Sequence, residues 1–165
     1  MIFKYSLAAV LILLSVNSWL LPASAGQSKY VPIAKYDPKR DAAGDIQDAI
    51  KEAQIRHQRI LLEVGGDWCS WCHTLDDFFA THPELLQLRD KNFVTVKINF
   101  SEENENKEVL ARYGPVESFP HLFVLDADGK LLLSKDTAAL ENGRSYDLGR
   151  LLAFLQEWAL QKPSR

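Results

Sequence analysis

Two spacings of hydrophobic residues dominate the chain after residue 40. Unbroken short apolar runs are typical of strands buried on both faces of a sheet. Apolar residues that recur every three or four positions are typical of helices that bury one face. The predicted strands cover residues 60–64, 93–98, 122–125 and 131–133. The predicted helices cover residues 46–53, 69–79, 84–90, 102–113 and 148–159. Asp45 and Ser101 are the expected caps of the first and fourth helices.

The order of these elements predicts the fold class. Alternating helices and strands build a parallel β-α-β unit, and the hairpin signal at residues 126–129 adds antiparallel strands to the same sheet. Residues 26–40 are predicted to form an N-terminal arm or a short edge strand. Residues 135–146 are interpreted either as a partner-specific lip or as a plain surface loop. We therefore expect residues 26–165 to form one α/β domain, with helices on both faces of a central mixed sheet.

The N-terminus has the pattern of a secretory signal peptide over residues 1–25. Lys4 precedes an apolar run at residues 7–21, and Ala23 and Ala25 form a small-x-small cleavage pattern. The run contains polar residues and is shorter than the roughly 20 residues of a membrane span, so the mature chain is not expected to cross a membrane. The C-terminus carries no retention signal for the endoplasmic reticulum. The predicted location is therefore the bacterial periplasm.

Composition and charge exclude other classes of protein. The 165 residues include 19 Lys and Arg against 22 Asp and Glu, for a formal net charge of -3. This balance lacks the basic footprint of a nucleic-acid-binding protein. The 2 cysteines cannot build a scaffold of several disulfides, so the hydrophobic core must hold the fold. We expect a monomer.

The candidate chemistry lies at Cys69 and Cys72, just past a predicted buried strand and at the start of a helix. With two residues between them, the sulfurs can meet across the first helical turn and form a small, easily opened disulfide ring. Free backbone N–H groups at a helix start stabilise an anion, and such a position lowers a thiol pKa from about 8.5 to between about 3.5 and 7.5. Cys69 is therefore the predicted attacking thiolate, and Cys72 the more buried resolving thiol.

A c-type haem protein is an alternative interpretation of the same residues. Cys69, Cys72 and His73 satisfy the Cys-x-x-Cys-His pattern of covalent haem attachment. His73 would then be an axial ligand, but the only methionine, Met1, leaves with the signal peptide. The predicted buried strand before Cys69 also leaves little room for a porphyrin. A structural zinc site needs four protein ligands, and we expect neither a metal nor a cofactor beyond the disulfide itself.

Beyond the two cysteines, the chain resembles the thioredoxin family. Residues 60–69 look like the family's strand that leads to a tryptophan and the reactive cysteine. Residues 94–99 are similar to its strand that carries a lysine, and residues 118–121 to its cis-proline loop. The resemblance covers about residues 45–158. It implies a thioredoxin-like three-layer fold and a thiol–disulfide oxidoreductase with a redox-active disulfide.

The resemblance also implies roles for individual residues. Glu63 occupies the place of the family's buried acid, which relays a proton to or from the resolving thiol, and Lys97 that of its partner. A carboxylate in an apolar run must be neutral or paired, unless Glu63 simply points outward at the strand end. Pro120 is expected to follow a cis peptide bond, the alternative being an ordinary trans-proline. The residues expected to bind substrate are Trp68, Trp71, Phe119 and Pro120.

Departures from the family pattern bear on the direction of electron flow. Oxidases of the family commonly have a histidine where this chain has Trp71, and Asp67 adds a negative charge near Cys69. Both features favour a reductase, or a thiol carrier fed by a membrane-bound electron donor, over a strong oxidase. The expected partners are thiols and disulfides of exported proteins or peptides. His73 is expected either to tune the pair or to have no special role. The remaining alternative is a peptide-binding or chaperone-like module without turnover.

Overall fold

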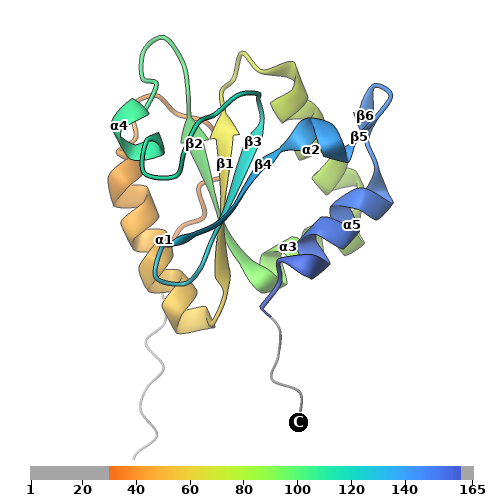
Figure 1. Ribbon diagram of the computed structural model, residues 1–165, viewed down its shortest axis with the longest axis horizontal. Coiled ribbons are helices and arrows are strands. Elements are labelled where there is room, and N and C mark those ends of the chain that lie inside the picture. Colours follow the sequence, from red (N-terminus) through yellow and green to blue (C-terminus); the bar gives the residue numbers. More distant parts are fainter. Residues whose placement is uncertain (1–29, 161–165) are drawn as a thin grey trace, which may run out of the picture.

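The structure is a computed structural model, and it describes residues 30–160 (Figure 1). The predicted signal peptide at residues 1–25 lies outside the described residues. Four strands form one mixed sheet in the order β2-β1-β3-β4. Their bounds are Arg59–Gly65 for β1, Phe93–Asn99 for β2, His121–Leu125 for β3 and Leu131–Asp136 for β4. β1 pairs with β2 in parallel and with β3 in antiparallel, and β3 pairs with β4 in antiparallel. The predicted mixed sheet is confirmed.

Helices cover both faces of this sheet. They are α1 (Ala42–Arg56), α2 (Ser70–Thr81), α3 (Pro83–Asn92), α4 (Lys107–Leu110) and α5 (Leu148–Glu157). α1 and α4 lie on one face, and α2, α3 and α5 lie on the other (Figure 1). The predicted three-layer α/β architecture is therefore confirmed. Within residues 30–160, no helix has both the length and the apolar character needed to cross a bilayer.

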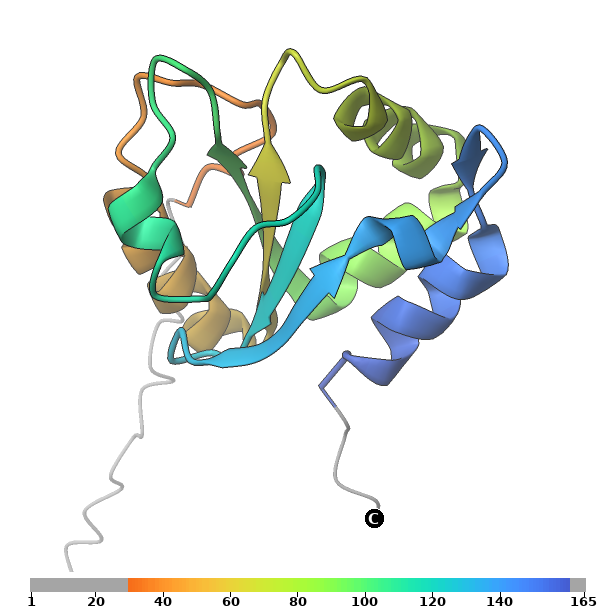
Figure 2. The same ribbon diagram turned by 45° about the horizontal axis from the view of Figure 1, so that its top comes forward.

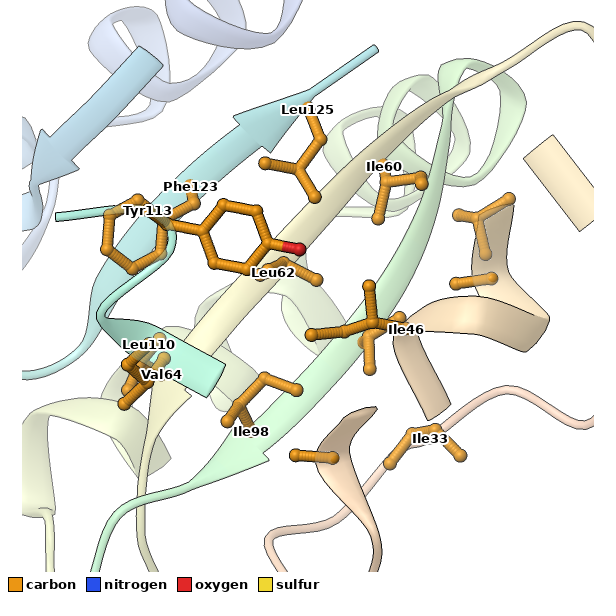
Figure 3. Packing of buried hydrophobic residues seen from close by; sticks show 14 of the residues in the cluster. Ile33, Ile46, Ile60, Leu62, Val64, Ile98, Leu110, Tyr113, Phe123 and Leu125 are labelled. Atoms are coloured by element: carbon orange, nitrogen blue, oxygen red, sulfur yellow. The ribbon is translucent and has the colours of Figure 1, made fainter. Parts of the chain in front are cut away.

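The central strand β1 separates two hydrophobic cores. Ile60, Leu62 and Val64 pack with α1 and α4 in the cluster of Figure 3. Leu61 lies on the opposite face, among residues of α2, α3 and α5. Burial of each such aliphatic side chain contributes about 1.5–3 kcal/mol. Because side chains alternate along a strand, Glu63 faces the α2 side of the sheet.

Helix α1 begins earlier than predicted, because Asp41 rather than Asp45 is its cap. The Asp41 carboxylate accepts a hydrogen bond from the Ala43 backbone N–H at 3.1 Å. Asp45 lies inside the first turn, where Arg40 holds it with two hydrogen bonds. An acidic side chain there still interacts favourably with the positive end of the helix. The prediction was therefore wrong by one helical turn.

We expect Asp41→Ala to lower the free energy of unfolding by about 1 kcal/mol, because it removes the cap of α1. Urea denaturation of the oxidised protein measures this change. Asp48→Ala on the same helix is the matched control, since Asp48 pairs only at the exposed surface with Lys51. The control should lose less than about 0.5 kcal/mol. Equal losses in the two variants would contradict the assignment of the cap.

The helix predicted at residues 102–113 is mostly absent, because only Lys107–Leu110 is α-helical. Ser101 and Asn104 exchange backbone hydrogen bonds at 3.1 Å in both directions and close a turn instead. Asn106 then has a φ of 50°, the left-handed conformation that asparagine tolerates better than most residues. Ser101 is therefore not a helix cap. The acidic residues between Ser101 and Asn106 belong to a loop.

The segment at residues 135–146 is more ordered than a plain surface loop. β4 continues to Asp136, and a 3₁₀ helix, η1 (Thr137–Leu140), follows it. Two short strands, β5 (Glu141–Asn142) and β6 (Ser145–Tyr146), then form a hairpin next to α2 (Figure 2). The side chains that this segment buries are Thr137, Leu140 and Tyr146. Whether it contacts a partner stays a prediction.

The remaining differences are small. Of the predicted edge strand at residues 26–40, the described part has only an isolated bridge, between Ile33 and Val96 of β2. Trp71 and Phe78 of α2 are half-buried rather than buried. α5 ends at Glu157, so Trp158 is its C-cap residue, and its side chain still packs against the same core as the apolar face of α5.

Candidate active site

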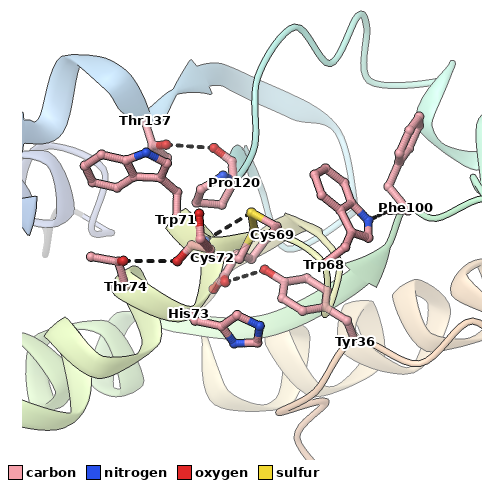
Figure 4. The surroundings of a disulfide bond; sticks show 12 residues. Tyr36, Trp68, Cys69, Trp71, Cys72, His73, Thr74, Phe100, Pro120 and Thr137 are labelled. Atoms are coloured by element: carbon pink, nitrogen blue, oxygen red, sulfur yellow. Dashed lines mark hydrogen bonds between the residues drawn. A yellow bond between two sulfur atoms is a disulfide. The ribbon is translucent and has the colours of Figure 1, made fainter. Parts of the chain in front are cut away.

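The redox pair lies at the start of α2, and Cys69 is the fourth residue after the end of β1. Cys69 is the N-cap residue of α2, Cys72 is in its first turn, and a disulfide joins their sulfurs (Figure 4). The Cys72 backbone N–H donates to the Cys69 sulfur, with a nitrogen–sulfur distance of 3.1 Å. Cys69 is 4% exposed and Cys72 is 0% exposed. The outer sulfur is therefore the one that a helix-start donor contacts, as a thiolate nucleophile requires.

A buried cluster of charged and polar groups lies behind the pair. Lys97 and Glu63 are register partners on β2 and β1, and the Lys97 Nζ is 2.9 Å from Glu63 Oε1. The same ammonium is 2.6 Å from the Asp76 carboxylate of α2. The Tyr36 hydroxyl donates to Glu63 Oε1 at 2.6 Å. Glu63 therefore points into this cluster and is not directed outward at the strand end.

Sequence analysis did not predict two members of this cluster, Asp76 and Tyr36. Asp76 lies four residues after Cys72, so both are on the inner face of α2, and that spacing was an available signal. Tyr36 comes from the arm before α1, where no periodic pattern marked it. Burial and Glu63 raise the pKa of Asp76, although Lys97 opposes them. Burial and Glu63 also raise the pKa of Tyr36 well above its ordinary value.

Gly65, at the end of β1, allows the inner sulfur to approach the sheet. A Cβ atom on this residue would overlap the Cys72 sulfur and lie 2.9 Å from the Tyr36 hydroxyl oxygen. The absence of a side chain therefore leaves room for both groups. Gly65 and Glu63 are two positions apart, so they face the same side of the sheet. The inner sulfur, the hydroxyl and the carboxylate all lie on that side.

Aromatic side chains form the rim of the disulfide. Trp68 is 57% exposed, and its ring meets that of Phe119 edge-on with 5.2 Å between centroids. Phe119 also packs against the buried cluster of Tyr36, Cys69 and Cys72, and its peptide bond to Pro120 is cis, as predicted. Trp71 contacts Tyr146 on the other side, with 5.6 Å between ring centroids. The four predicted substrate-binding residues therefore surround the disulfide.

Near Trp68 a cavity of about 420 Å³ opens beside the rim. Trp68 donates from its indole nitrogen to the Phe100 carbonyl at 2.7 Å, which fixes the ring at the edge of this cavity. Its lining residues are Trp68, Phe100, Ser101, Glu102, Glu103 and Glu105. The loop at residues 101–106, where a helix was predicted, therefore supplies one wall of this cavity.

His73 bears on the haem alternative. Its Nε2 atom, which an iron would need, is 2.8 Å from the Asp67 carbonyl oxygen. The two sulfurs that thioether bonds would use are joined to each other. Among residues 30–160, no group of three or more His, Cys, Asp or Glu side chains is arranged to hold a metal ion. These contacts favour the redox interpretation of the motif.

A mixed sheet with a disulfide at the start of the helix after β1, and a cis-proline beside it, defines the thioredoxin-fold class of proteins. Comparison of the sequence with protein-family models is consistent with this class. The model of the thioredoxin-like family matches residues 41–127, and the chain belongs to this family.

Individual relatives support the same class. Disulfide bond reductase DsbH of Chlamydia pneumoniae is 30% identical over 94 residues, which are 52% of this chain and 56% of that protein. The chain thus spans about half the length of this curated relative. The crystal structure of a disulphide isomerase from Xylella fastidiosa Temecula1 is 26% identical, with a TM-score of 0.65 over 78% of this chain and 98% of that chain.

A third comparison concerns the fold alone. The oxidised C-terminal domain of DsbD from Neisseria meningitidis is 19% identical, with a TM-score of 0.53. The match covers 72% of this chain and 96% of the DsbD domain. The thioredoxin-like fold of the described residues is therefore shared with solved disulfide-exchange proteins.

Proposed function

We propose that this protein is a thiol–disulfide oxidoreductase that exchanges disulfides with exported proteins or peptides through Cys69 and Cys72. The observation that carries the proposal is the hydrogen bond from the Cys72 backbone N–H to the Cys69 sulfur at the start of α2. This donor stabilises Cys69 as a thiolate once the disulfide is reduced. Relatives named as a disulfide bond reductase and a disulphide isomerase support the same chemistry.

In the reductive direction, the Cys69 thiolate attacks one sulfur of a substrate disulfide. A bond forms between Cys69 and that sulfur, and the other substrate sulfur leaves as a thiolate. The Cys72 thiol then loses its proton, with Glu63 as the acceptor, and attacks the Cys69 sulfur. This releases the second substrate thiolate, which takes a proton from solvent. Two electrons have passed from the cysteine pair to the substrate, and the pair is oxidised.

We further propose that the pair acts as a reductase or thiol carrier. Trp71 stands where a histidine would stabilise the thiolate and make the disulfide strongly oxidising, and Trp71 packs on Tyr146 instead. The negative charge of Asp67, two residues before Cys69, also disfavours the thiolate form of Cys69. Each effect makes the disulfide harder to reduce. A membrane-bound donor in the periplasm would return electrons to the pair, and no cofactor other than the disulfide is required.

Substrate is proposed to bind at the aromatic rim. Trp68 offers exposed apolar surface on one side of the disulfide, where the half-buried Phe119 packs against it, and Trp71 lies on the other side. Backbone groups next to Pro120 would hydrogen-bond an extended segment of the substrate. The protein that acts there would be the mature chain, residues 26–165, exported by its signal peptide.

Reduction of insulin by dithiothreitol, followed as turbidity, tests the proposed activity. We expect micromolar protein to start precipitation of the insulin B chain well before dithiothreitol alone does. The same protein with the outer thiol, Cys69, blocked by iodoacetamide is the matched control, because it loses the nucleophile and leaves the buried Cys72 sulfur unmodified. Identical curves for the active and blocked proteins would reject turnover and leave the peptide-binding alternative.

A further inference from the structure

The arm before α1 inserts a tyrosine into the pair formed by Glu63 and Lys97. Two contacts fix the arm on either side of Tyr36. The Lys97 backbone N–H donates to the Ile33 carbonyl at 3.3 Å, and the Asn104 side chain donates to the Pro38 carbonyl at 2.9 Å. Tyr36 is only 5% exposed. The arm therefore holds this side chain in a defined place inside the protein.

Each part of the Tyr36 side chain has its own contact. The hydroxyl donates to Glu63 Oε1 at 2.6 Å, on the same oxygen that accepts from Lys97. The ring lies against the Lys97 ammonium, whose Nζ is 4.3 Å from the ring centroid. A hydrogen bond to an ionised acceptor is among the stronger ones in proteins. The hydroxyl therefore stabilises the charged form of Glu63, while the ring covers the lysine.

The same hydroxyl lies on the sulfur side of Glu63. A Cβ atom on Gly65 would meet both the Cys72 sulfur and the Tyr36 hydroxyl oxygen, so these two groups flank one point above the strand. Tyr36 and the two cysteines also form one packed cluster. Figure 4 shows the Tyr36 ring reaching toward the disulfide from below Trp68. The hydroxyl is thus adjacent to both the inner sulfur and the acid proposed to take its proton.

We propose that Tyr36 is a positioning residue that holds Glu63 ionised and oriented for removing the proton of Cys72, an inference that rests on the proposed function. In this step the S–H bond of Cys72 breaks and its proton goes to a Glu63 oxygen. The electron pair left on Cys72 forms a bond to Cys69, and the bond from Cys69 to the substrate sulfur breaks. Tyr36 keeps its own proton throughout, since burial and Glu63 raise its pKa well above the ordinary value.

Other charged and titratable groups also face Glu63. They are Lys97 from β2, Asp76 from α2 and Tyr146 from β6. Tyr36→Phe leaves all of them, and the ring over Lys97, in place. It removes a single donor from the Glu63 carboxylate. The variant therefore isolates the hydroxyl from the rest of the cluster.

The test follows the two steps of a single turnover separately. Reduced protein is mixed with oxidised glutathione, quenched with acid at set times and alkylated, and mass spectrometry measures the mixed disulfide at Cys69. For Tyr36→Phe at pH 7 we expect formation within about twofold of wild type and resolution by Cys72 about tenfold slower. The pH profile of resolution should also move to higher pH, because the carboxylate has lost a hydrogen-bond donor to its charged form. At high pH the two resolution rates should converge.

Tyr30→Phe is the matched control, because it removes a hydroxyl from the same arm that donates instead to the Thr95 carbonyl. Its two rates and its pH profile should be those of wild type. A pH profile for Tyr36→Phe that coincides with wild type would overturn the role of Tyr36. Wild-type protein that forms neither the mixed disulfide nor the Cys69–Cys72 disulfide under these conditions would instead overturn the proposed function.

A double variant covers the case in which Tyr36→Phe does not fold. In Tyr36→Phe alone, the buried Glu63 carboxylate has one hydrogen-bond donor fewer. Adding Glu63→Gln removes the charge of that carboxylate. We expect Tyr36→Phe to add no further slowing in this background, since Tyr36 acts through Glu63. A further tenfold loss relative to Glu63→Gln alone would show that the hydroxyl acts in another way, and would overturn the proposal.

Discussion

Cys69→Ser should lower the catalysed rate of insulin reduction by about 100-fold or more, to the rate of dithiothreitol alone. A serine hydroxyl is not ionised at neutral pH, and the remaining thiol, Cys72, is 0% exposed and therefore poorly placed to attack a substrate. The turbidity assay measures this loss, and thermal unfolding of the reduced proteins checks the fold. Activity near that of wild type would show that Cys69 is not the nucleophile.

Cys72→Ser is the matched partner of this variant, because it keeps the attacking thiolate and removes the resolving one. It should also lose turnover, but it should accumulate a mixed disulfide between Cys69 and its substrate. Mass spectrometry after acid quenching detects this species. Peptide binding that survives in both variants is compatible with an oxidoreductase. Rescue of the phenotype of a gene deletion by Cys69→Ser would instead favour a peptide-binding module without turnover.

Lys97→Met should lower the free energy of unfolding by about 3–5 kcal/mol, because it leaves the Glu63 charge buried without its cation. Glu63 is 1% exposed, and Asp76 loses the same partner. Urea denaturation of the oxidised protein at pH 7 measures this change. Methionine has a similar length and fills the space of the lysine stem, so the effect comes from the charge rather than from a cavity.

Lys51→Met provides the comparison for an exposed ion pair. Lys51 and Asp48 are 70% and 67% exposed, and such pairs contribute about 0–1 kcal/mol. The variant should therefore unfold almost as wild type does. A Lys97→Met variant that loses less than about 1 kcal/mol would mean that the buried cluster does not depend on its ammonium group.

Local patterns were enough to predict the elements that position the redox pair. The apolar run at residues 60–64 has no polar residue except Glu63, which is what a strand buried on both faces requires. The two glycines after it end the strand, and Cys69 begins the helix pattern. These signals lie within a few residues of one another, so no long-range contact was needed to interpret them.

Contacts between distant residues account for the parts that the sequence did not predict. Residues 102–113 have the composition of a helix, but the Asn104 side chain donates to the Pro38 carbonyl, 66 positions away, and this contact holds the segment in a loop. Tyr36 contacts Glu63 across 27 positions of sequence. Nothing in the neighbours of Tyr36 distinguishes it from the other tyrosine of the arm, Tyr30. Only the tertiary structure separates the two.

Asp76, the acidic residue after the motif, lies between these two cases, because only part of its placement could be predicted from local sequence. Asp76 is one helical turn beyond Cys72, so helix geometry alone placed it on the inner face of α2. Its contact with Lys97 follows once that lysine is placed opposite Glu63 on the neighbouring strand. The sequence therefore contained the signal, but its interpretation required the register between β1 and β2.

The reduction potential of the Cys69 and Cys72 couple tests the central claim most directly. Equilibration with a series of dithiothreitol or glutathione buffers, followed by alkylation and mass spectrometry, gives the fraction oxidised. We expect a potential closer to the about -270 mV of reducing thioredoxins than to the about -120 mV of a strong periplasmic oxidase. A value near about -120 mV would contradict the assignment as a reductase or thiol carrier.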